Sequence, residues 1–196
     1  MRLVVYVLFC AHFFTPTNAL AADNQGKFSV KGIGVLSCEA FVKAKDNKES
    51  AYLHFGGWIE GYLSASNKHL DKTYDIAPWQ TTETISTIAY TACKRNPEAN
   101  FARTVDEIAG RLSQTSLDTP SKVINITHGK YSVSIPAAIY ENAKNRLKSL
   151  NMLEGEGNRD ETKEALIQYQ IKKGLPVTGL PDQYTLWNLL ESESSE

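Results

Sequence analysis

Apolar side chains recur every three or four positions in four segments between residues 37 and 114. This spacing predicts four amphipathic helices, the first of them capped by Ser37 and the fourth running from about Asn100. The third helix is expected to end at Asn96, because the residue before a proline disfavours helical geometry. We therefore expect a four-helix unit over residues 37–114.

The second of these helices has the clearest pattern and also contains three glycines, Gly56, Gly57 and Gly61. Glycine inside a helix costs up to about 1 kcal/mol relative to alanine. Three such residues are tolerable if another helix packs closely against their face.

A strand pattern follows a polar, linker-like stretch at residues 115–121. Residues 123–127 and 131–135 each alternate between apolar and polar side chains, and Gly129 lies between them. This arrangement predicts a β-hairpin that turns at the glycine. Because an isolated hairpin is only marginally stable, it should pack on a neighbouring element.

Three more helices are predicted after the hairpin. The first follows Pro136, the second begins near Asp160 and ends at a left-handed Gly174, and the third is capped by Asp182. The expected fold is mainly α, with a four-helix unit, a short hairpin and a three-helix unit. The expected domain boundaries are 37–114 for the first helical unit, 115–136 for the linker and hairpin, 137–191 for the second helical unit and 192–196 for a tail.

The first residues have the pattern of an export signal. An apolar run at residues 3–14 follows Arg2, and Ala19-Leu20-Ala21 fits a small-x-small cleavage site. The run is shorter than the roughly 20 residues that span a bilayer, although an uncleaved membrane anchor is the alternative. We expect a cleaved signal peptide at 1–21, a loose polar leader at 22–36, and a periplasmic or secreted protein.

Removal of the signal peptide leaves two cysteines, Cys38 and Cys93. An even number of cysteines in an exported protein predicts a disulfide. Closing a loop of 55 residues would stabilise the fold by about 4 kcal/mol in the chain-entropy model. The alternatives are two unpaired thiols or a zinc site, and the chain has neither a Cys-x-x-Cys motif nor paired histidines to favour zinc.

Charge and residue pattern exclude several classes of function. The formal net charge of −1 argues against a general attraction to nucleic acid, and no basic block indicates membrane-surface binding. The histidines outside the signal peptide, His54, His69 and His128, lie in separate predicted elements without a nucleophile nearby. We therefore expect a protein that is not an enzyme, wall-lytic or other, and that needs no metal or cofactor.

The order of parts over residues 139–190 resembles the peptidoglycan-binding domain family. That family has a leucine-bearing helix, a glycine loop, a Thr-x-x-Ala helix ending in an aromatic residue and Gln, a Gly-Leu turn and a last Thr-Leu helix. The matching positions here are Leu147, Leu150, Gly155, Gly157, Thr162, Ala165, Tyr169, Gln170, Gly174, Leu175, Gly179, Thr185 and Leu186. The resemblance implies a three-helix fold and peptidoglycan, or a protein in the wall, as ligand. The chain departs from the family at residues 157–161, where an Asp-Gly-x-Phe-Gly loop is usual.

A wall ligand presents sugars, amides and carboxylates. Its groove would use backbone amides at a helix start, polar side-chain donors and an aromatic wall. The exposed polar candidates beside the two predicted loops are Arg159, Asp160, Gln170 and Asp182. The alternative for each is a helix cap or solvated surface, and Tyr169 and Trp187 are more often core residues than sugar platforms.

Two further resemblances concern the first helical unit. Residues 37–41 and 93–101, Ser-Cys-Glu-Ala-Phe and Cys-Lys-Arg-Asn-Pro-Glu-Ala-Asn-Phe, resemble the periplasmic acid-stress chaperone HdeA, a four-helix protein with one disulfide. This implies a protein that loosens and exposes apolar surface as its carboxylates are protonated. Residues 58–67 also resemble small exported helical proteins that neutralise toxic effectors. Either likeness implies a protein-binding unit, with the C-terminal repeat as an anchor or a protein interface.

Overall fold

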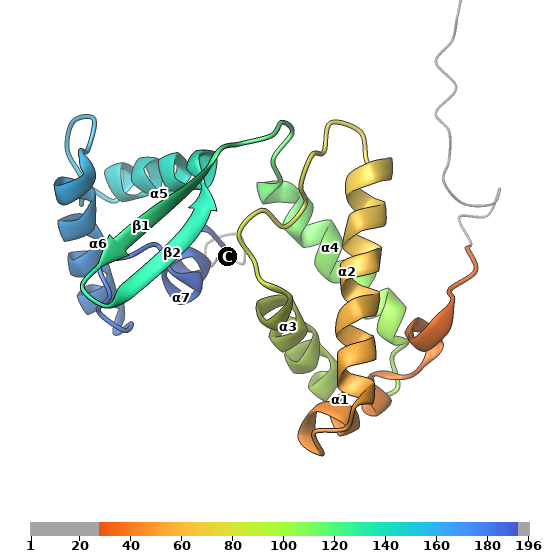
Figure 1. Ribbon diagram of the computed structural model, residues 1–196. Helices are drawn as coiled ribbons and strands as arrows, with labels where there is room; N and C mark the ends of the chain where they lie inside the picture. The colour runs from red at the N-terminus through yellow and green to blue at the C-terminus, as the bar shows by residue number, and fades with distance from the viewer. Residues whose placement is uncertain (1–27, 192–196) are drawn as a thin grey trace, which may run out of the picture.

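A computed structural model describes residues 28–191 of the chain (Figure 1). The predicted signal peptide, the first part of the leader and the tail at 192–196 lie outside the described residues. Seven α-helices and one antiparallel hairpin make the described part mainly helical, as predicted. The helices are α1 (Cys38–Asp46), α2 (Ala51–His69), α3 (Thr82–Arg95), α4 (Phe101–Leu112), α5 (Ala137–Ser149), α6 (Arg159–Lys173) and α7 (Gln183–Leu186), and the strands are β1 (Val123–His128) and β2 (Tyr131–Pro136).

Helices α1 to α4 pack around one apolar cluster, which we call the first core. Phe41 of α1, Phe55 of α2 and Phe101 of α4 meet at its centre, with ring centroids 4.7 to 5.1 Å apart. All three rings are fully buried. Pairs of aromatic rings at this distance add to the stability gained from burial alone, so these residues tie three helices together.

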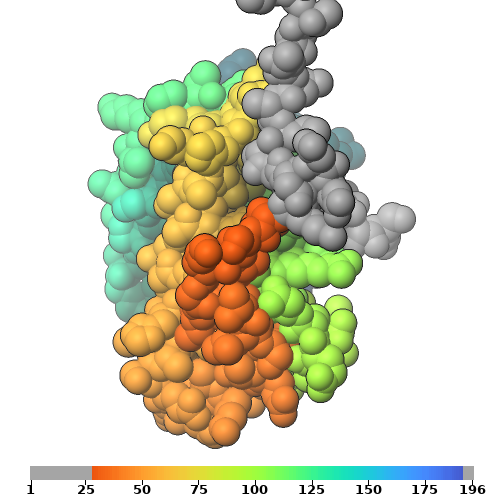
Figure 2. All heavy atoms as spheres, turned by 90° about the vertical axis from the view of Figure 1, so that its right-hand side faces the viewer, coloured from red at the N-terminus to blue at the C-terminus, as the bar shows by residue number. Residues whose placement is uncertain are grey.

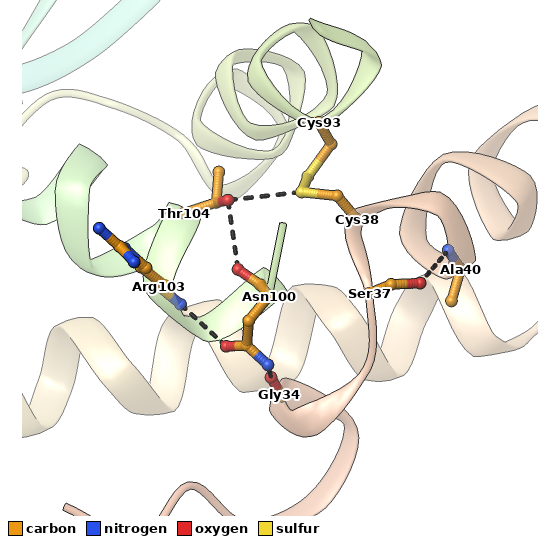
Figure 3. Close-up of a disulfide and its surroundings, with 8 residues drawn as sticks. All are labelled: Gly34, Ser37, Cys38, Ala40, Cys93, Asn100, Arg103 and Thr104. Atoms are coloured by element: carbon orange, nitrogen blue, oxygen red, sulfur yellow. Dashed lines mark hydrogen bonds between the residues drawn. A yellow bond between two sulfur atoms is a disulfide. The ribbon is translucent and has the colours of Figure 1, made fainter. Parts of the chain in front are cut away.

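The predicted disulfide between Cys38 and Cys93 is confirmed (Figure 3). It joins the first residue of α1 to the last turns of α3, and both cysteines are fully buried. Thr104 of α4 lies against the bridge, with its hydroxyl 3.4 Å from the Cys38 sulfur. Ser37 caps α1 as predicted, because its side chain accepts a hydrogen bond from the Ala40 amide.

The leader before α1 was expected to be loose, and the structure corrects this for its last part. Residues 32–35 form a 3-10 turn, η1 (Gly32–Val35), which lies between α2 and α4 (Figure 2). The indole of Trp58 donates a hydrogen bond to the Lys31 carbonyl at 2.9 Å, and its ring lies against Gly34. A Cβ on Gly34 would approach that ring to 2.3 Å. The polar composition of the leader gave no sign of this close contact between Gly34 and Trp58, which a larger residue than glycine would obstruct.

The glycine face of α2 is largely open within residues 28–191. Gly57 and Gly61 have no atom within 4 Å of the position a Cβ would take, and Gly56 meets only the Thr82 methyl group at 3.8 Å. No helix of the described residues packs closely on this face, so the glycines weaken α2 without a packing benefit from them.

No helix within residues 28–191 is long and apolar enough to cross a membrane.

The hairpin forms as predicted and belongs to a second apolar cluster, which we call the second core. Strands β1 and β2 pair in antiparallel register, and Gly129 makes the turn with φ +57°. Ile126 and Ile135 are the hairpin's buried residues, and they pack with α5, α6 and α7. The hairpin therefore leans on the helices that follow it in sequence, on the left in Figure 1.

The C-terminal helices begin and end where local signals predicted. Gly174 ends α6 in the left-handed conformation, and the Leu175 amide then bonds back to the Gln170 carbonyl at 2.9 Å. Asp182 caps α7, which is only four residues long. The chain then continues as one π-helical turn, η3 (Trp187–Glu191).

One loop residue connects the two cores. Trp79 lies between α2 and α3 in sequence, yet it is buried in the second core. We call this contact between the two cores the seam. Gln183 stabilises it, because its side-chain amide donates to the Trp79 carbonyl and accepts from the Thr84 hydroxyl at 2.7 Å. Glu191 accepts hydrogen bonds there from Gln80 at 3.3 Å and Thr115 at 2.9 Å.

Candidate functional site

Two of the four predicted site residues line one small pocket. This hollow, the α6 pocket, has a volume of about 180 Å³ and lies between the tip of the hairpin and the start of α6. Arg159 and Asp160 line it together with Lys163 from the next turn of α6. His128 of β1 and Tyr140 of α5 complete its polar and aromatic lining. Gln170 and Asp182 lie elsewhere.

The start of α6 is held in place by its own capping residues. The side chain of Asn158 accepts hydrogen bonds from the Asp160 and Glu161 amides, both at 3.0 Å. The Glu161 carboxylate in turn accepts a hydrogen bond from the Asn158 amide at 2.8 Å, which completes a capping box. The amides of Asp160 and Glu161 are therefore already used within the cap, and the charged donors that line the pocket are the side chains of Arg159 and Lys163.

Positive charge in the pocket comes from two residues one helical turn apart. Arg159 and Lys163 are four positions apart on α6 and therefore lie on the same side of the helix. Lys163 forms an ion pair with Asp160 at 3.2 Å, but the Asp160 side chain is 92% exposed. Such an exposed pair contributes little to stability. A ligand carboxylate can therefore compete for the lysine at low cost.

His128 enters the pocket from the hairpin with a defined tautomer. Its Nδ1 lies 2.7 Å from the Thr178 carbonyl oxygen. A carbonyl only accepts, so Nδ1 carries the proton and Nε2 is left to accept from a ligand. The loop approaches this ring closely, since a Cβ on Gly179 would lie 2.7 Å from Nδ1. Gly179, which also has φ +66°, is therefore required for the imidazole to seat.

Gln170 was expected to be exposed, and the structure shows it to be fully buried. Its side-chain nitrogen donates to the Leu180 carbonyl at 3.0 Å and to the Thr185 hydroxyl at 2.9 Å. Its oxygen accepts from the amides of Thr178 and Gly179, both at 2.9 Å. The glutamine organises the loop after α6 from inside. Sequence alone could not show this, because its partners lie 8 to 15 positions further along the chain.

Asp182 is the cap of α7 and not a free ligand group. Its carboxylate accepts from the Thr185 amide at 2.9 Å and from the Thr178 hydroxyl at 2.6 Å. The side chain is half-buried against the same loop. This is the helix-cap role that the sequence left open as the alternative to ligand binding.

Several other positions that carry the family resemblance are structural. Tyr169 is buried in the second core, and burial raises the pKa of its phenol. Thr162 is fully buried, with its hydroxyl bonded to the Gly157 carbonyl at 3.3 Å. A Cβ on Gly157 would lie 2.7 Å from Leu153. These residues shape the helices and turns that support the α6 pocket and do not face it.

Sequence reasoning missed three residues of the α6 pocket, namely His128, Tyr140 and Lys163. The spacing of Lys163 from Arg159 was a usable signal, because residues at i and i+4 share one face of a helix. His128 and Tyr140 lie 31 and 19 positions before Arg159 in the sequence, and no local pattern points to them. Within residues 28–191, no group of three or more side chains is placed to bind a metal ion.

Comparison with known proteins adds no relative to this picture. No family model matches the chain, and neither the curated proteins nor the solved structures compared with it include a match.

Proposed function

We propose that this chain is an exported, non-enzymatic cell-envelope protein that binds peptidoglycan at the α6 pocket. In this proposal the second core and its helices form a peptidoglycan-binding-like domain, and helices α1 to α4 form an HdeA-like interaction domain. The observation that carries the proposal is the meeting of Arg159 and Asp160 with His128 and Lys163 in one pocket. The order of helix, glycine loop, helix, turn and short helix gives it further support.

The chemistry of the pocket suits a fragment of the cell wall. The stem peptides of peptidoglycan carry carboxylates and amides, which Arg159 and Lys163 can bind through charge-assisted hydrogen bonds. The His128 Nε2 and the Asp160 carboxylate supply acceptors for amide or hydroxyl hydrogens. Tyr140 offers an aromatic wall for a sugar ring or an aliphatic side chain.

The test is co-sedimentation of the purified protein with insoluble wall sacculi. Replacing Arg159 and Lys163 by alanine together is expected to weaken binding by about tenfold or more, because charged hydrogen-bond donors are lost. The matched control replaces Lys172 and Lys173, which are exposed at the other end of the same helix. Equal sedimentation of both variants, or no sedimentation of the unaltered protein, would remove the proposal. Point changes are preferable to deleting residues 137–196, because deletion would uncover Trp79.

A second candidate function, acid-activated chaperoning by helices α1 to α4, is favoured by the carboxylates that join these helices. Four carboxylates each accept a hydrogen bond from a helix other than their own. The pairs are Glu60 with Thr82, Asp46 with Tyr90, Asp106 with Tyr62 and Glu83 with Lys45. The hydrogen bond from Lys45 holds the pKa of Glu83 below its usual value. Stability that depends on this charge is present above the usual carboxyl pKa and is lost as the pH falls through the lowered one.

Acid-induced loosening would be measured by the fluorescence of a hydrophobic dye and by the aggregation of a client protein at about pH 2–3. We expect increased dye binding and less client aggregation than without the protein. Replacing Glu83 by glutamine should shift the onset of dye binding, because the charge that Lys45 stabilises is lost. The same change at Glu107, which pairs within α4, should not. Unchanged dye fluorescence and no client protection would exclude this function.

A further inference from the structure

A second hollow, which we call the α3–α7 groove, runs along the outer face of α3. Its volume is about 590 Å³, and it is separate from the α6 pocket. Thr84, Ile88, Thr91 and Arg95 line it at positions i, i+4, i+7 and i+11. This spacing places them in one stripe along the helix. The stripe alternates hydroxyl groups with apolar surface and ends in a cation.

The opposite wall of the groove is aromatic. Tyr184 of α7 is 69% exposed, although it is a large and partly apolar side chain. Trp187 is half-buried, since one part of its ring packs on the second core and another part lines the groove. Figure 1 shows α3 as the helix that stands opposite α7. Aromatic residues in such positions are typical of protein-binding surfaces.

The two walls are held at a fixed separation. The Gln183 side chain accepts from the Thr84 hydroxyl at 2.7 Å and from the Thr81 amide at 3.2 Å. It also donates to the Trp79 carbonyl. These bonds join α7 to the start of α3, so the groove is formed before any ligand arrives. A preformed groove loses less conformational entropy on binding.

Two cations give the groove its charge. Arg95 and Arg111 both line it, both are exposed, and neither pairs with an acidic side chain within residues 28–191. The one carboxylate in the lining, Glu83, is engaged by Lys45 at 2.9 Å and by the Tyr52 hydroxyl at 2.9 Å. The groove therefore offers free positive charge beside an apolar and aromatic surface.

We propose that the α3–α7 groove binds an acidic segment of a partner protein that also carries an aliphatic or aromatic side chain. Arg95 and Arg111 hold its carboxylates, and Tyr184 and Trp187 cover its apolar side chain. The hydroxyls of Thr84 and Thr91 already donate to Gln183 and to the Thr87 carbonyl, and their oxygens can accept from the segment's backbone amides. This inference does not rest on wall binding at the α6 pocket.

Nucleic acid fits the groove less well than an acidic peptide. Two arginines are a small electrostatic footprint for a phosphate backbone, and the whole chain has a net charge of −1. The apolar stripe of Ile88 and Trp187 would remain uncovered by phosphates and sugars. An acidic segment with an apolar side chain satisfies both the charge and the apolar surface.

The test selects displayed random peptides on the immobilised full chain and then measures the affinity of one labelled, selected peptide by fluorescence anisotropy. We expect selection of peptides in which acidic residues flank an apolar one. Replacing Arg95 and Arg111 by glutamine should weaken binding by about tenfold or more. Tyr184→Ser, a change at an exposed position, should also weaken it and leave the fold intact.

The matched control replaces Lys94 and Arg103 by glutamine, which removes the same charge from the same two helices outside the groove. Its affinity should equal that of the unaltered chain. Equal loss in both double variants, or selection of peptides without acidic residues, overturns the proposal. So does peptide binding that is seen only after residues 192–196 are removed, because the acidic end of this chain would then be the occupant. Co-sedimentation with sacculi should be unaffected by the Arg95 and Arg111 changes, which separates this proposal from wall binding.

Discussion

At the scale of single residues, buried polar groups decide how the C-terminal loops are arranged. Gln170 satisfies two loop amides and two hydroxyls from a fully buried position. Burying a polar side chain is favourable only when its hydrogen bonds are complete. The loop that supports His128 in the α6 pocket therefore depends on a residue that does not line the pocket.

Replacing Gln170 by alanine should lower the free energy of unfolding by about 2–4 kcal/mol. The loss arises because the buried amide of Gly179 would lose its acceptor and the buried carbonyl of Leu180 would lose its donor. Urea denaturation followed by circular dichroism measures it. The control is Gln168→Ala on the same helix, where the side chain is exposed and bonds only Glu164. Similar losses in the two variants would contradict the role given to Gln170.

Glu191 is expected to make stability depend on pH at the seam between the cores. Burial raises the pKa of its carboxyl, and the bond from Thr115 only partly opposes this. The folded state thus keeps the proton more strongly than the unfolded state, whose pKa is about 4.3. Stability from this group is full below that value and falls as the pH rises through the raised pKa.

Glu191→Gln should therefore raise Tm at pH 7 and leave it nearly unchanged at about pH 3, where the glutamate is already protonated. Glutamine keeps an oxygen that can accept from Gln80 and Thr115. Thermal unfolding of both proteins across this pH range measures the difference. A Tm difference that is the same at both pH values would show that the carboxylate charge is not the cause.

At the scale of elements, helices and turns were predictable because their signals are local. Ser37, Gly129, Gly174 and Asp182 each took the predicted role as cap or turn residue. The burial of Gln170 and the course of the leader were not predictable, because they depend on contacts far along the chain. Whether another helix covers the glycine face of α2 was also not predictable, since helix periodicity does not reveal which face a neighbour covers.

Replacing glycine by alanine should stabilise the protein on the open face of α2 and destabilise it at Gly34. Gly57→Ala and Gly61→Ala should each raise the free energy of unfolding by about 0.5–1 kcal/mol, because nothing obstructs the added methyl group. Gly34→Ala should lower it, because Trp58 occupies the space that the methyl group needs. Urea midpoints of the three variants provide the comparison. Destabilisation by all three would show that the α2 face is covered.

At the scale of the whole molecule, the disulfide and the seam set how the chain is tied together. The Cys38–Cys93 bond closes a loop of 55 residues that contains α1, α2 and most of α3. A covalent link of this length stabilises a fold mainly by restricting the unfolded chain. Cysteine number and the export pattern made the bond predictable. The contact between the cores was not predictable, because Trp79 and the hydrogen bonds of Gln183 and Glu191 join residues far apart in sequence.

Replacing both Cys38 and Cys93 by alanine should lower the free energy of unfolding by about 2–4 kcal/mol. The measurement is urea denaturation of the oxidised protein and the double variant. The unaltered protein in excess reductant should approach the variant, since both lack the closed loop. An unchanged midpoint in either case would show that the bond does not restrict the unfolded chain.

Trp79 has a mechanical consequence for a protein that is held at one end. Residues 113–122 are the covalent path from α4 to β1, but the seated indole forms a second connection in parallel with it. A pull that separates the two cores must first extract this ring and break the bonds from Gln183 to Trp79 and Thr84. The peptide linker would bear load only afterwards. The force that separates the two cores would therefore be set by the burial of Trp79 together with the hydrogen bonds of Gln183.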